Sequence, residues 1–389
     1  RCWACRSRTE SNTTRNDNDN DNDNDNDTEE TMKSKQIASA LLALAAAPFA
    51  AAQTSVTLYG VADIGLEFLT QANANGNTLT RMSAGNVSGS RWGLRGTEDL
   101  GSGLKGIFVL ESGFDLDTGV MGQAGRLFGR QAFVGVEHAW GRLTLGRQQN
   151  TLYDLLINYE PMVLAARYSA LGLDPTLVGR NDNTAKYTGK FGPVTATAFY
   201  SFARGTSVTT AGVSSIAGET PGDLKSDRAL GGGLEYASGP FGATIIYDQQ
   251  QGTRGITGQN SAQTDRRIAA AANFAFGSST ILAGYRWFNG DIGGARRNDL
   301  FWLGYRYQAT PALTLTGAGY VFNNRRNGQD PWELVASANY AFSKRTDAFL
   351  TVGYVHNKDD SNLGLNGFGS TIKPGANQTG VSLSIRHKF

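Results

Sequence analysis

Apolar and polar residues alternate one by one in many short segments of the chain, from about residue 55 to the last residue. In residues 194–202 the alternating Val, Ala, Tyr and Phe side chains share one face, Thr and Ser take the other, and Phe199 departs from the pattern. The same period of two occurs in residues 267–276, 281–287, 301–307 and 334–342. Successive side chains of a β-strand point to opposite faces, so this period predicts strands with one apolar and one polar face.

The connections between these segments alternate in length. Seven short turns lie near residues 98–103, 139–141, 190–193, 238–240, 277–279, 309–311 and 343–344. Eight longer polar spans cover residues 70–87, 113–125, 148–182, 204–226, 250–264, 289–298, 323–331 and 357–377. Fifteen connections join sixteen strands, and aromatic residues gather near the strand ends, where membrane–water interfaces place Tyr and Trp.

The pattern predicts an all-β fold, a 16-stranded antiparallel transmembrane β-barrel with short periplasmic turns and long extracellular loops. A closed barrel pairs every backbone N–H and C=O within the protein, as a hydrocarbon environment requires. From residue 53 onward no run of 18 apolar residues occurs, which excludes transmembrane helices. A soluble β-sandwich would give the same period of two and is the structural alternative.

The first 52 residues have a different composition. Residues 1–31 lack a Met and contain a bare Asn-Asp alternation, so we expect a disordered segment or sequence upstream of the true start. Residues 32–52 combine Lys33 and Lys35, an apolar stretch and a small-residue cleavage site, which is typical of a secretory signal peptide. We expect the barrel to comprise residues 53–389.

Charge and cysteine content narrow the function. The full chain has 36 basic and 34 acidic residues, and residues 1–52 hold more acid than base, so the remainder is mildly basic. No basic stripe accompanies this excess, so we expect no nucleic-acid partner, although the excess could bias a pore towards anions. Cys2 and Cys5 both lie in the upstream segment, which excludes a disulfide scaffold or a four-ligand zinc site in the barrel. We expect no metal and no cofactor.

Two other classes of function were weighed against a channel. An enzyme is not expected, because the three histidines, His138, His356 and His387, stand in no catalytic motif and neither G-x-S-x-G nor H-E-x-x-H occurs. An adhesin or receptor remains an alternative, since the spans 204–226 and 357–377 are long and rich in Gly, Ser, Thr and Asn, and loops commonly carry binding.

Five segments add a resemblance to a known family. In chain order they read SVTLYGVADIGLEF, SRWGLRGTEDLGSGLKGIFVLESGF, GRQAFVGVEHAWGRLTLGRQ, NTAKYTGKFGPVTATAFYSF and SLSIRHKF. With them, residues 32–389 resemble the trimeric general porins of Gram-negative bacteria, particularly the betaproteobacterial type. The resemblance implies an outer-membrane homotrimer, each barrel with a water-filled pore for small hydrophilic solutes and ions. It also implies contact with outer-membrane lipid, lipopolysaccharide and the outer-membrane assembly machinery, which reads a terminal Phe such as Phe389.

The resemblance further implies that the third long loop, residues 148–182, folds into the barrel and narrows the pore. In such porins basic residues of the wall face acidic residues of this loop, and the field between them screens ions by charge. The expected wall residues are Arg91, Arg130, Arg180 and Lys186. The expected loop carboxylates are Asp154, Glu160 and Asp174.

Three questions stay open at this level. The enterobacterial Pro-Glu-Phe-Gly loop tip is absent and Glu160-Pro161 inverts its order, so the sequence does not select the acid at the narrowest point. Each wall arginine could instead pair with a neighbouring carboxylate without influencing permeation. A substrate-selective porin is a further alternative, because Arg167 and the loop tyrosines could bind an aromatic or carboxylate solute.

Overall fold

The computed structural model describes residues 55–389 except 211–212 and 366–371. The expected upstream segment, residues 1–31, and the expected signal peptide, residues 32–52, lie outside the described residues. Across the described residues, no helix has the length and hydropathy needed to cross a membrane.

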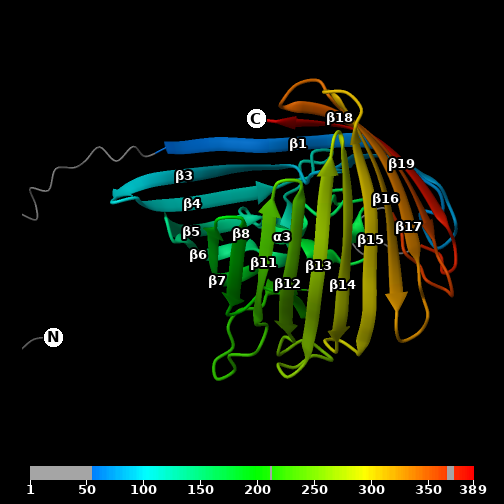
Figure 1. Ribbon diagram of the computed structural model, residues 1–389. Helices are drawn as coiled ribbons and strands as arrows, with labels where there is room; N and C mark the ends of the chain where they lie inside the picture. The colour runs from blue at the N-terminus through cyan, green and yellow to red at the C-terminus, as the bar shows by residue number, and fades with distance from the viewer. Residues whose placement is uncertain (1–54, 211–212, 366–371) are drawn as a thin grey trace, which may run out of the picture. The chain divides into compact units, whose positions relative to one another are not determined.

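Strands make up more than half of the described chain and nearly all of its regular secondary structure (Figure 1). The strands are β1 (Ser55–Leu69), β2 (Leu79–Ala84), β3 (Arg91–Gly101), β4 (Leu104–Gly113), β5 (Gln131–His138), β6 (Gly141–Gln149), β7 (Arg180–Phe191), β8 (Val194–Ser201), β9 (Ser207–Thr210), β10 (Val213–Ile216), β11 (Ala229–Ser238), β12 (Phe241–Gln251), β13 (Thr264–Phe276), β14 (Ser279–Gly290), β15 (Arg296–Gln308), β16 (Leu313–Asn324), β17 (Trp332–Ala341), β18 (Thr346–His356) and β19 (Gln378–Lys388).

One antiparallel sheet of 17 of these strands closes on itself. From β3 to β8 and from β11 to β19 each strand pairs with the next one in the sequence, β8 pairs with β11, and β1 pairs with β19 and β3 to complete the ring. Strands β2 and β3 pair with successive parts of β1 and occupy one position in the barrel, so the barrel has sixteen strand positions. The predicted 16-stranded antiparallel barrel is confirmed.

The second barrel position departs from the sequence expectation. Residues 70–87 were expected to be one long loop, but β2 lies inside that span and residues 85–90 interrupt the strand before β3. The carboxylate of Asp63 on β1 holds the interruption by accepting hydrogen bonds from the backbone N–H groups of Asn86, Val87 and Ser88, at 3.1, 3.0 and 2.8 Å. A buried carboxylate from another strand therefore supplies the acceptors that this irregular backbone needs.

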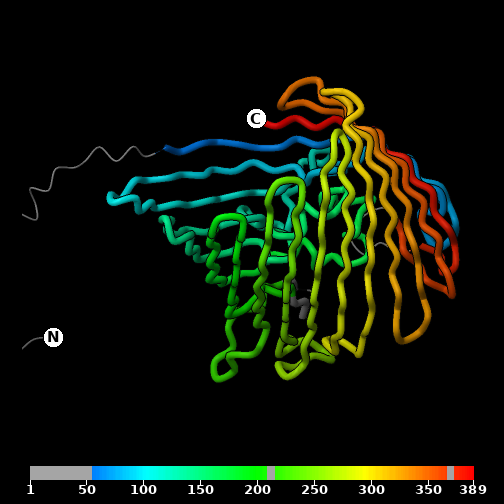
Figure 2. The backbone as a smooth tube through the Cα atoms, in the orientation of Figure 1, coloured from blue at the N-terminus to red at the C-terminus, as the bar shows by residue number. Residues whose placement is uncertain are grey.

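Short and long connections alternate around the barrel, and the long ones gather at one end (Figure 2). Strands β9 and β10 form a separate hairpin within the loop after β8. A single irregular turn, α2 (Gly122–Gly125), lies in the loop after β4. The longest continuous loop, residues 150–179 between β6 and β7, contains α3 (Thr151–Leu156) and the 3₁₀ turns Ala170–Gly172 and Pro175–Val178.

The outer face of the sheet is apolar. In β13 Ile268, Phe274 and Phe276 are exposed on the outside, while Arg267 and Ala269 are buried on the inside. Two aromatic belts border the outer face. The belt at the turn end includes Tyr236, Phe241, Phe274, Phe276, Tyr305, Tyr307, Tyr340 and Phe342, and the belt at the loop end includes Tyr200, Tyr247, Tyr285, Phe301, Trp332 and Tyr354. An apolar band between aromatic belts matches the depth profile of a lipid bilayer.

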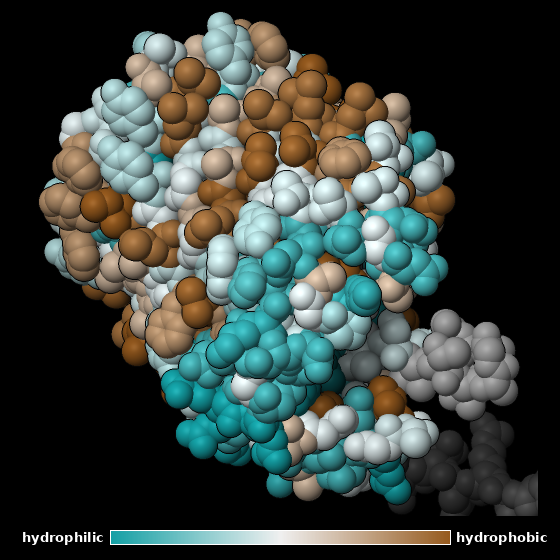
Figure 3. Space-filling view, turned by 90° about the vertical axis from the view of Figure 1, so that its right-hand side faces the viewer, coloured by the Kyte–Doolittle hydropathy of each residue, from teal (hydrophilic) through white to brown (hydrophobic). Residues whose placement is uncertain are grey.

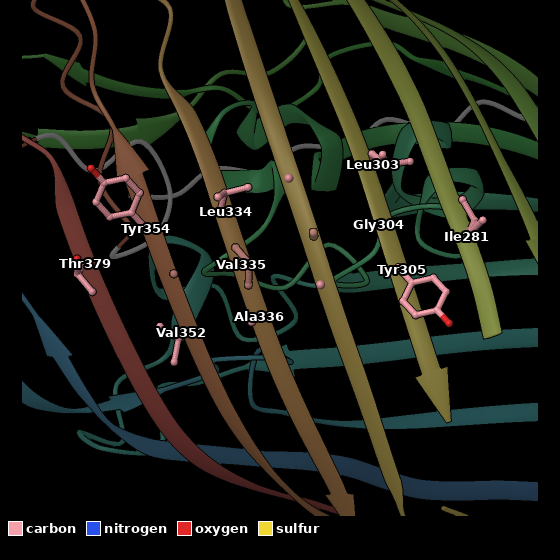
Figure 4. A pocket seen from close by; sticks show the side chains of 14 residues that line it. Ile281, Leu303, Gly304, Tyr305, Leu334, Val335, Ala336, Val352, Tyr354 and Thr379 are labelled. Carbon is pink, nitrogen blue, oxygen red and sulfur yellow. The ribbon is translucent and has the colours of Figure 1, made fainter. Parts of the chain in front are cut away.

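The space-filling view shows the same division. Hydrophobic residues cover much of the face in Figure 3, and hydrophilic residues gather towards its lower end, where Figure 1 draws the long loops. A groove on the outer face extends from Ile281 on β14 to Thr379 on β19, with Leu303, Tyr305, Leu334 and Tyr354 along its sides (Figure 4). The groove exists because glycine and alanine residues lie between these larger side chains. It is part of the membrane-facing surface.

The main cluster of buried apolar side chains lies inside the barrel, around residues 150–179. Leu152, Leu155 and Leu156 of α3 pack with inner-wall residues such as Ile246 on β12 and Trp302 on β15. The loop therefore folds inward and covers one side of the inner wall. We call residues 150–179 the constriction loop.

Candidate functional site

The two ends of the constriction loop are tied together where it leaves the wall. The backbone N–H of Asn150 donates to the carbonyl of Gly179 at 2.9 Å. The Asn150 side chain accepts from the N–H of Tyr153, which caps α3, and donates to the carbonyl of Thr176. Asparagine is a favoured residue at this cap because its short side chain reaches the free N–H groups of the first turn.

Glycines of the inner wall let the loop approach the sheet closely. A Cβ atom at Gly304 would stand 2.2 Å from Cγ of Pro161, and one at Gly353 would stand 2.5 Å from Cδ1 of Tyr168. A Cβ at Gly233 would likewise meet Leu155 at 2.6 Å. These distances are far below van der Waals contact, so the missing side chains make room for the loop.

The Asp174 carboxylate attaches the loop to the far wall. Its Oδ2 lies 2.9 Å from Nε of Arg267 on β13 and 3.0 Å from Nε of Arg286 on β14, and all three residues are buried. Burial alone would raise the pKa of Asp174, but the two guanidinium groups outweigh burial and lower the pKa to about 2. Asp174 is therefore ionised at neutral pH and serves as an anchor.

The Glu160 carboxylate attaches the loop at a second point. It accepts hydrogen bonds from the Tyr320 hydroxyl on β16 and, within the loop, from the backbone N–H groups of Leu164 at 2.7 Å and Ala170 at 3.3 Å. Complete burial raises the pKa of Glu160, and these hydrogen bonds oppose the rise. The residue fixes both the shape of the loop tip and its contact with the wall.

The Asp154 carboxylate makes the third attachment. Its Oδ2 lies 2.7 Å from Nζ of Lys186 on β7, and Lys186 also donates to the carbonyl of Gln149 at 2.9 Å. Lys186 is buried, and the Asp154 carboxylate compensates its charge at the base of the loop. All three expected loop carboxylates thus bind wall or loop atoms.

A cavity of about 630 Å³ lies on the other side of the loop, between the loop and the wall that includes β1, β3, β7 and β19. Six basic side chains line it, Arg91, Arg130, Arg167, Arg180, Arg386 and Lys388. The acidic side chain in its lining is Asp115. The cavity is therefore strongly biased towards positive charge.

The basic residues of the cavity differ in how far their charge is compensated. Arg91 and Arg130 share the buried carboxylate of Glu111, with N–O distances of 3.6 and 2.7 Å. Arg386 pairs with Asp347 at 2.6 Å. Arg180 forms no ion pair with any described carboxylate, and its Nε is buried without a hydrogen-bond partner. Arg167 and Lys388 likewise form no ion pair with any described carboxylate, so the charges of these three residues are the least compensated in the cavity.

The structure brings three of the four expected wall residues, Arg91, Arg130 and Arg180, to one cavity, and places Lys186 at the root of the loop. The carboxylates expected opposite them, on Asp154, Glu160 and Asp174, are not among the residues that line this cavity.

Sequence reasoning did not assign Arg386 or Lys388 to the site. The alternation of the last strand, which places both residues on its polar face, was the available signal. Arg167, considered as a solute-binding residue, also lines the cavity and donates to the Asn86 side chain at 2.8 Å.

Within the part of the chain that the structure describes, no group of three or more His, Cys, Asp or Glu side chains is placed to hold a metal ion. The cavity instead offers guanidinium and ammonium groups, which attract anions without a covalent step. This arrangement supports passage or binding of anions.

Comparisons with known proteins agree with this geometry. Residues 38–360 match the family model described as Gram-negative porin. An outer membrane porin protein of Bordetella pertussis is 30% identical over an alignment 402 residues long, and this alignment covers 92% of this chain and all of the relative. Outer membrane porin protein 32 of Delftia acidovorans is 31% identical over 379 residues, with the same coverage.

Solved structures give the same result. The anion-selective porin from Comamonas acidovorans has a TM-score of 0.72 and 27% identity, and the match covers 87% of this chain and all of that one. OmpF of Salmonella typhi shares the fold alone, with a TM-score of 0.60 and 16% identity over 86% of this chain and 97% of that one. The closed barrel, the inward loop and the family match together identify this chain as a member of the Gram-negative porins, channel proteins of the outer membrane.

Proposed function

We propose that this porin lets small hydrophilic solutes and ions diffuse passively across the outer membrane and prefers anions. The observation that carries the proposal is the cavity beside the constriction loop, which is lined by six basic side chains and one acidic one. Solutes move down their own gradients, so the proposal needs neither a chemical step nor a cofactor.

The electrostatic argument depends on the imbalance of charge at a narrow place. Low-dielectric walls focus the field of charged residues into a pore, which raises the local concentration of ions of opposite sign. Arg91, Arg130 and Arg386 are partly compensated by carboxylates behind them, whereas Arg167, Arg180 and Lys388 form no ion pair with any described carboxylate. A net positive constriction follows from this pairing.

The expected site residues receive two different roles in this proposal. Arg91, Arg130 and Arg180 act on the solute from the wall. Lys186 pairs with Asp154. This ion pair and the wall contacts of Glu160 and Asp174 together hold the constriction loop against the barrel. The loop acids then set the width of the pore through the position of the loop, and they contribute little to the field in the cavity.

The resemblance and the apolar outer face support an assembly proposal. We infer a homotrimer in outer-membrane lipid and lipopolysaccharide, exported by the signal peptide of residues 32–52. The chain end closes the barrel, where the N–H of Phe389 donates to the carbonyl of Gly60 at 3.1 Å and its ring is half exposed. A terminal aromatic residue in this position is available to the assembly machinery.

The test is electrical. Residues 53–389 are refolded with detergent and lipid, and planar-bilayer currents are recorded under a salt gradient. We expect stepwise conductance in groups of three and a reversal potential on the anion side. A folded, heat-resistant oligomer that carries no current would contradict the channel, and a cation-side reversal potential would contradict the role of the arginines.

A further inference from the structure

The cavity has two chemically different walls. The barrel side carries five of the six basic residues. The loop side contributes the sixth, Arg167, and is otherwise mainly apolar, with Tyr153, Ile157, Val163 and Val178 at the surface and Leu164 and Leu171 beneath them. Val163 is 38% exposed, which is a large fraction for an aliphatic residue inside a barrel. A solute in the cavity therefore meets cationic groups on the barrel side and, apart from Arg167, a mainly apolar surface on the loop side.

No carboxylate of the constriction loop reaches this apolar surface. Asp154, Glu160 and Asp174 are all engaged with Lys186, Tyr320 or the pair Arg267 and Arg286, away from the cavity. The loop side therefore neither repels an anion nor competes for the wall arginines. Its apolar residues are free to contact the body of a bound solute.

The backbone of the loop tip places these apolar residues at a conformational cost. Val163 and Leu164 have φ angles of 52° and 51°, in the left-handed region, which is a steric outlier for a β-branched residue such as Val163. The tip is held there because the N–H of Leu164 donates to the Glu160 side chain and the N–H of Val163 donates to the Glu160 carbonyl. Glycine or asparagine would fit this backbone more easily, and strained positions of this kind concentrate at functional sites.

From this geometry we propose that the constriction is a binding site for amphiphilic organic anions, meaning carboxylates with an apolar body. The proposal rests on the anion-preferring channel of the proposed function and adds a ligand class to it. The carboxylate pairs with guanidinium groups of the wall, and Arg180, which lines the cavity and forms no ion pair with any described carboxylate, is the first candidate. The apolar body lies against Ile157, Val163 and Val178.

The consequence is a longer stay of such anions in the constriction. Small hydrophilic anions still pass, since they use the arginines alone. An apolar body that leaves water at the loop surface adds a hydrophobic contribution. We expect this to lower the half-blocking concentration about tenfold relative to a polar anion of similar size.

The test uses the full trimer in a planar bilayer with sodium chloride at pH 7, where carboxylates are ionised. Sodium cyclohexanecarboxylate is the probe, sodium gluconate is the control with a polar body, and cyclohexylmethanol is the neutral control for effects on the lipid. We expect concentration-dependent block and longer closed events with cyclohexanecarboxylate. Equal block by gluconate, or equal block by the neutral alcohol, would overturn the proposal.

A loop variant tests the assignment of the apolar surface. Val163→Asn introduces a residue that tolerates the positive φ of this position and makes the surface polar. We expect it to remove most of the advantage of cyclohexanecarboxylate over gluconate while the channel stays anion-preferring. The matched control is Leu224→Asn at a residue that is 78% exposed in the loop after β8 and does not line the cavity.

The two proposals fail in different ways. If the channel is anion-preferring but the two anions block alike, or Val163→Asn changes nothing, the amphiphile site is wrong and the proposed function stands. If the reversal potential shows no anion preference, the proposed function fails first, irrespective of block.

Discussion

Replacing Asp174 by Asn should loosen the constriction loop without unfolding the barrel. The substitution keeps the shape of the side chain but removes the carboxylate with which the buried Arg267 and Arg286 both pair. Losing one partner of a buried ion pair costs about 3–5 kcal/mol. The pKa gives a smaller value, because lowering it from 3.8 to about 2 corresponds to about 2 kcal/mol in favour of the attached loop.

We use the smaller free energy for displacement of the loop, because the two arginines can reach water once the loop moves. About 2 kcal/mol changes the ratio of attached to displaced loop about thirtyfold. The apolar cluster around α3 remains in the variant, so we expect brief excursions of the loop and not its permanent release. Single-channel recordings at pH 7 should show more open-channel noise and more frequent substates.

The pH dependence supplies an internal check. The pKa of Asp174 is lowered in the folded protein, so its stabilising contribution is complete above about pH 4 and is lost as the pH falls towards 2. The unchanged protein should therefore become noisier over this range, and Asp174→Asn should lack the part of the change that Asp174 causes. Asp359→Asn, at an exposed residue that pairs with Lys358, is the control and should behave like the unchanged protein. Quiet currents from Asp174→Asn at pH 7, equal to those of the control, would refute the anchoring role.

Three further predictions follow from charge, close packing and the chain end. Arg180→Ala and Arg130→Ala should each shift the reversal potential towards zero, because each removes one positive charge from the cavity lining, and an unchanged reversal potential would argue against a role in anion preference. Gly304→Val should alter conductance by pushing the loop tip off the wall, whereas Gly317→Val, on the next strand with nothing within 4 Å of its Cβ position, should not, as single-channel conductance would reveal. Deletion of Phe389 should reduce the amount of heat-resistant trimer in the outer membrane, and normal levels on a semi-native gel would contradict the assembly role.

The architecture could be predicted from the sequence because its cause is local. Each strand has one face towards hydrocarbon, so the period of two recurs wherever the chain crosses, as in residues 267–276. The count of sixteen followed from the alternation of turns and loops. The interruption at residues 85–90 could not be predicted from the sequence, because its hydrogen-bond acceptors come from Asp63, a residue of another strand.

The sequence predicted Arg91 as a wall residue through the family resemblance, and it placed Arg386 on the polar face of an alternating strand without assigning it to the site. Only the tertiary structure decided which way the loop carboxylates point. Asp174 meets Arg267 across 93 residues and Glu160 meets Tyr320 across 160, and a loop without periodicity carries no local signal for such partners. The direction of a side chain on an irregular segment is set by the wall against which that segment packs, and this contact exists only once the barrel has closed.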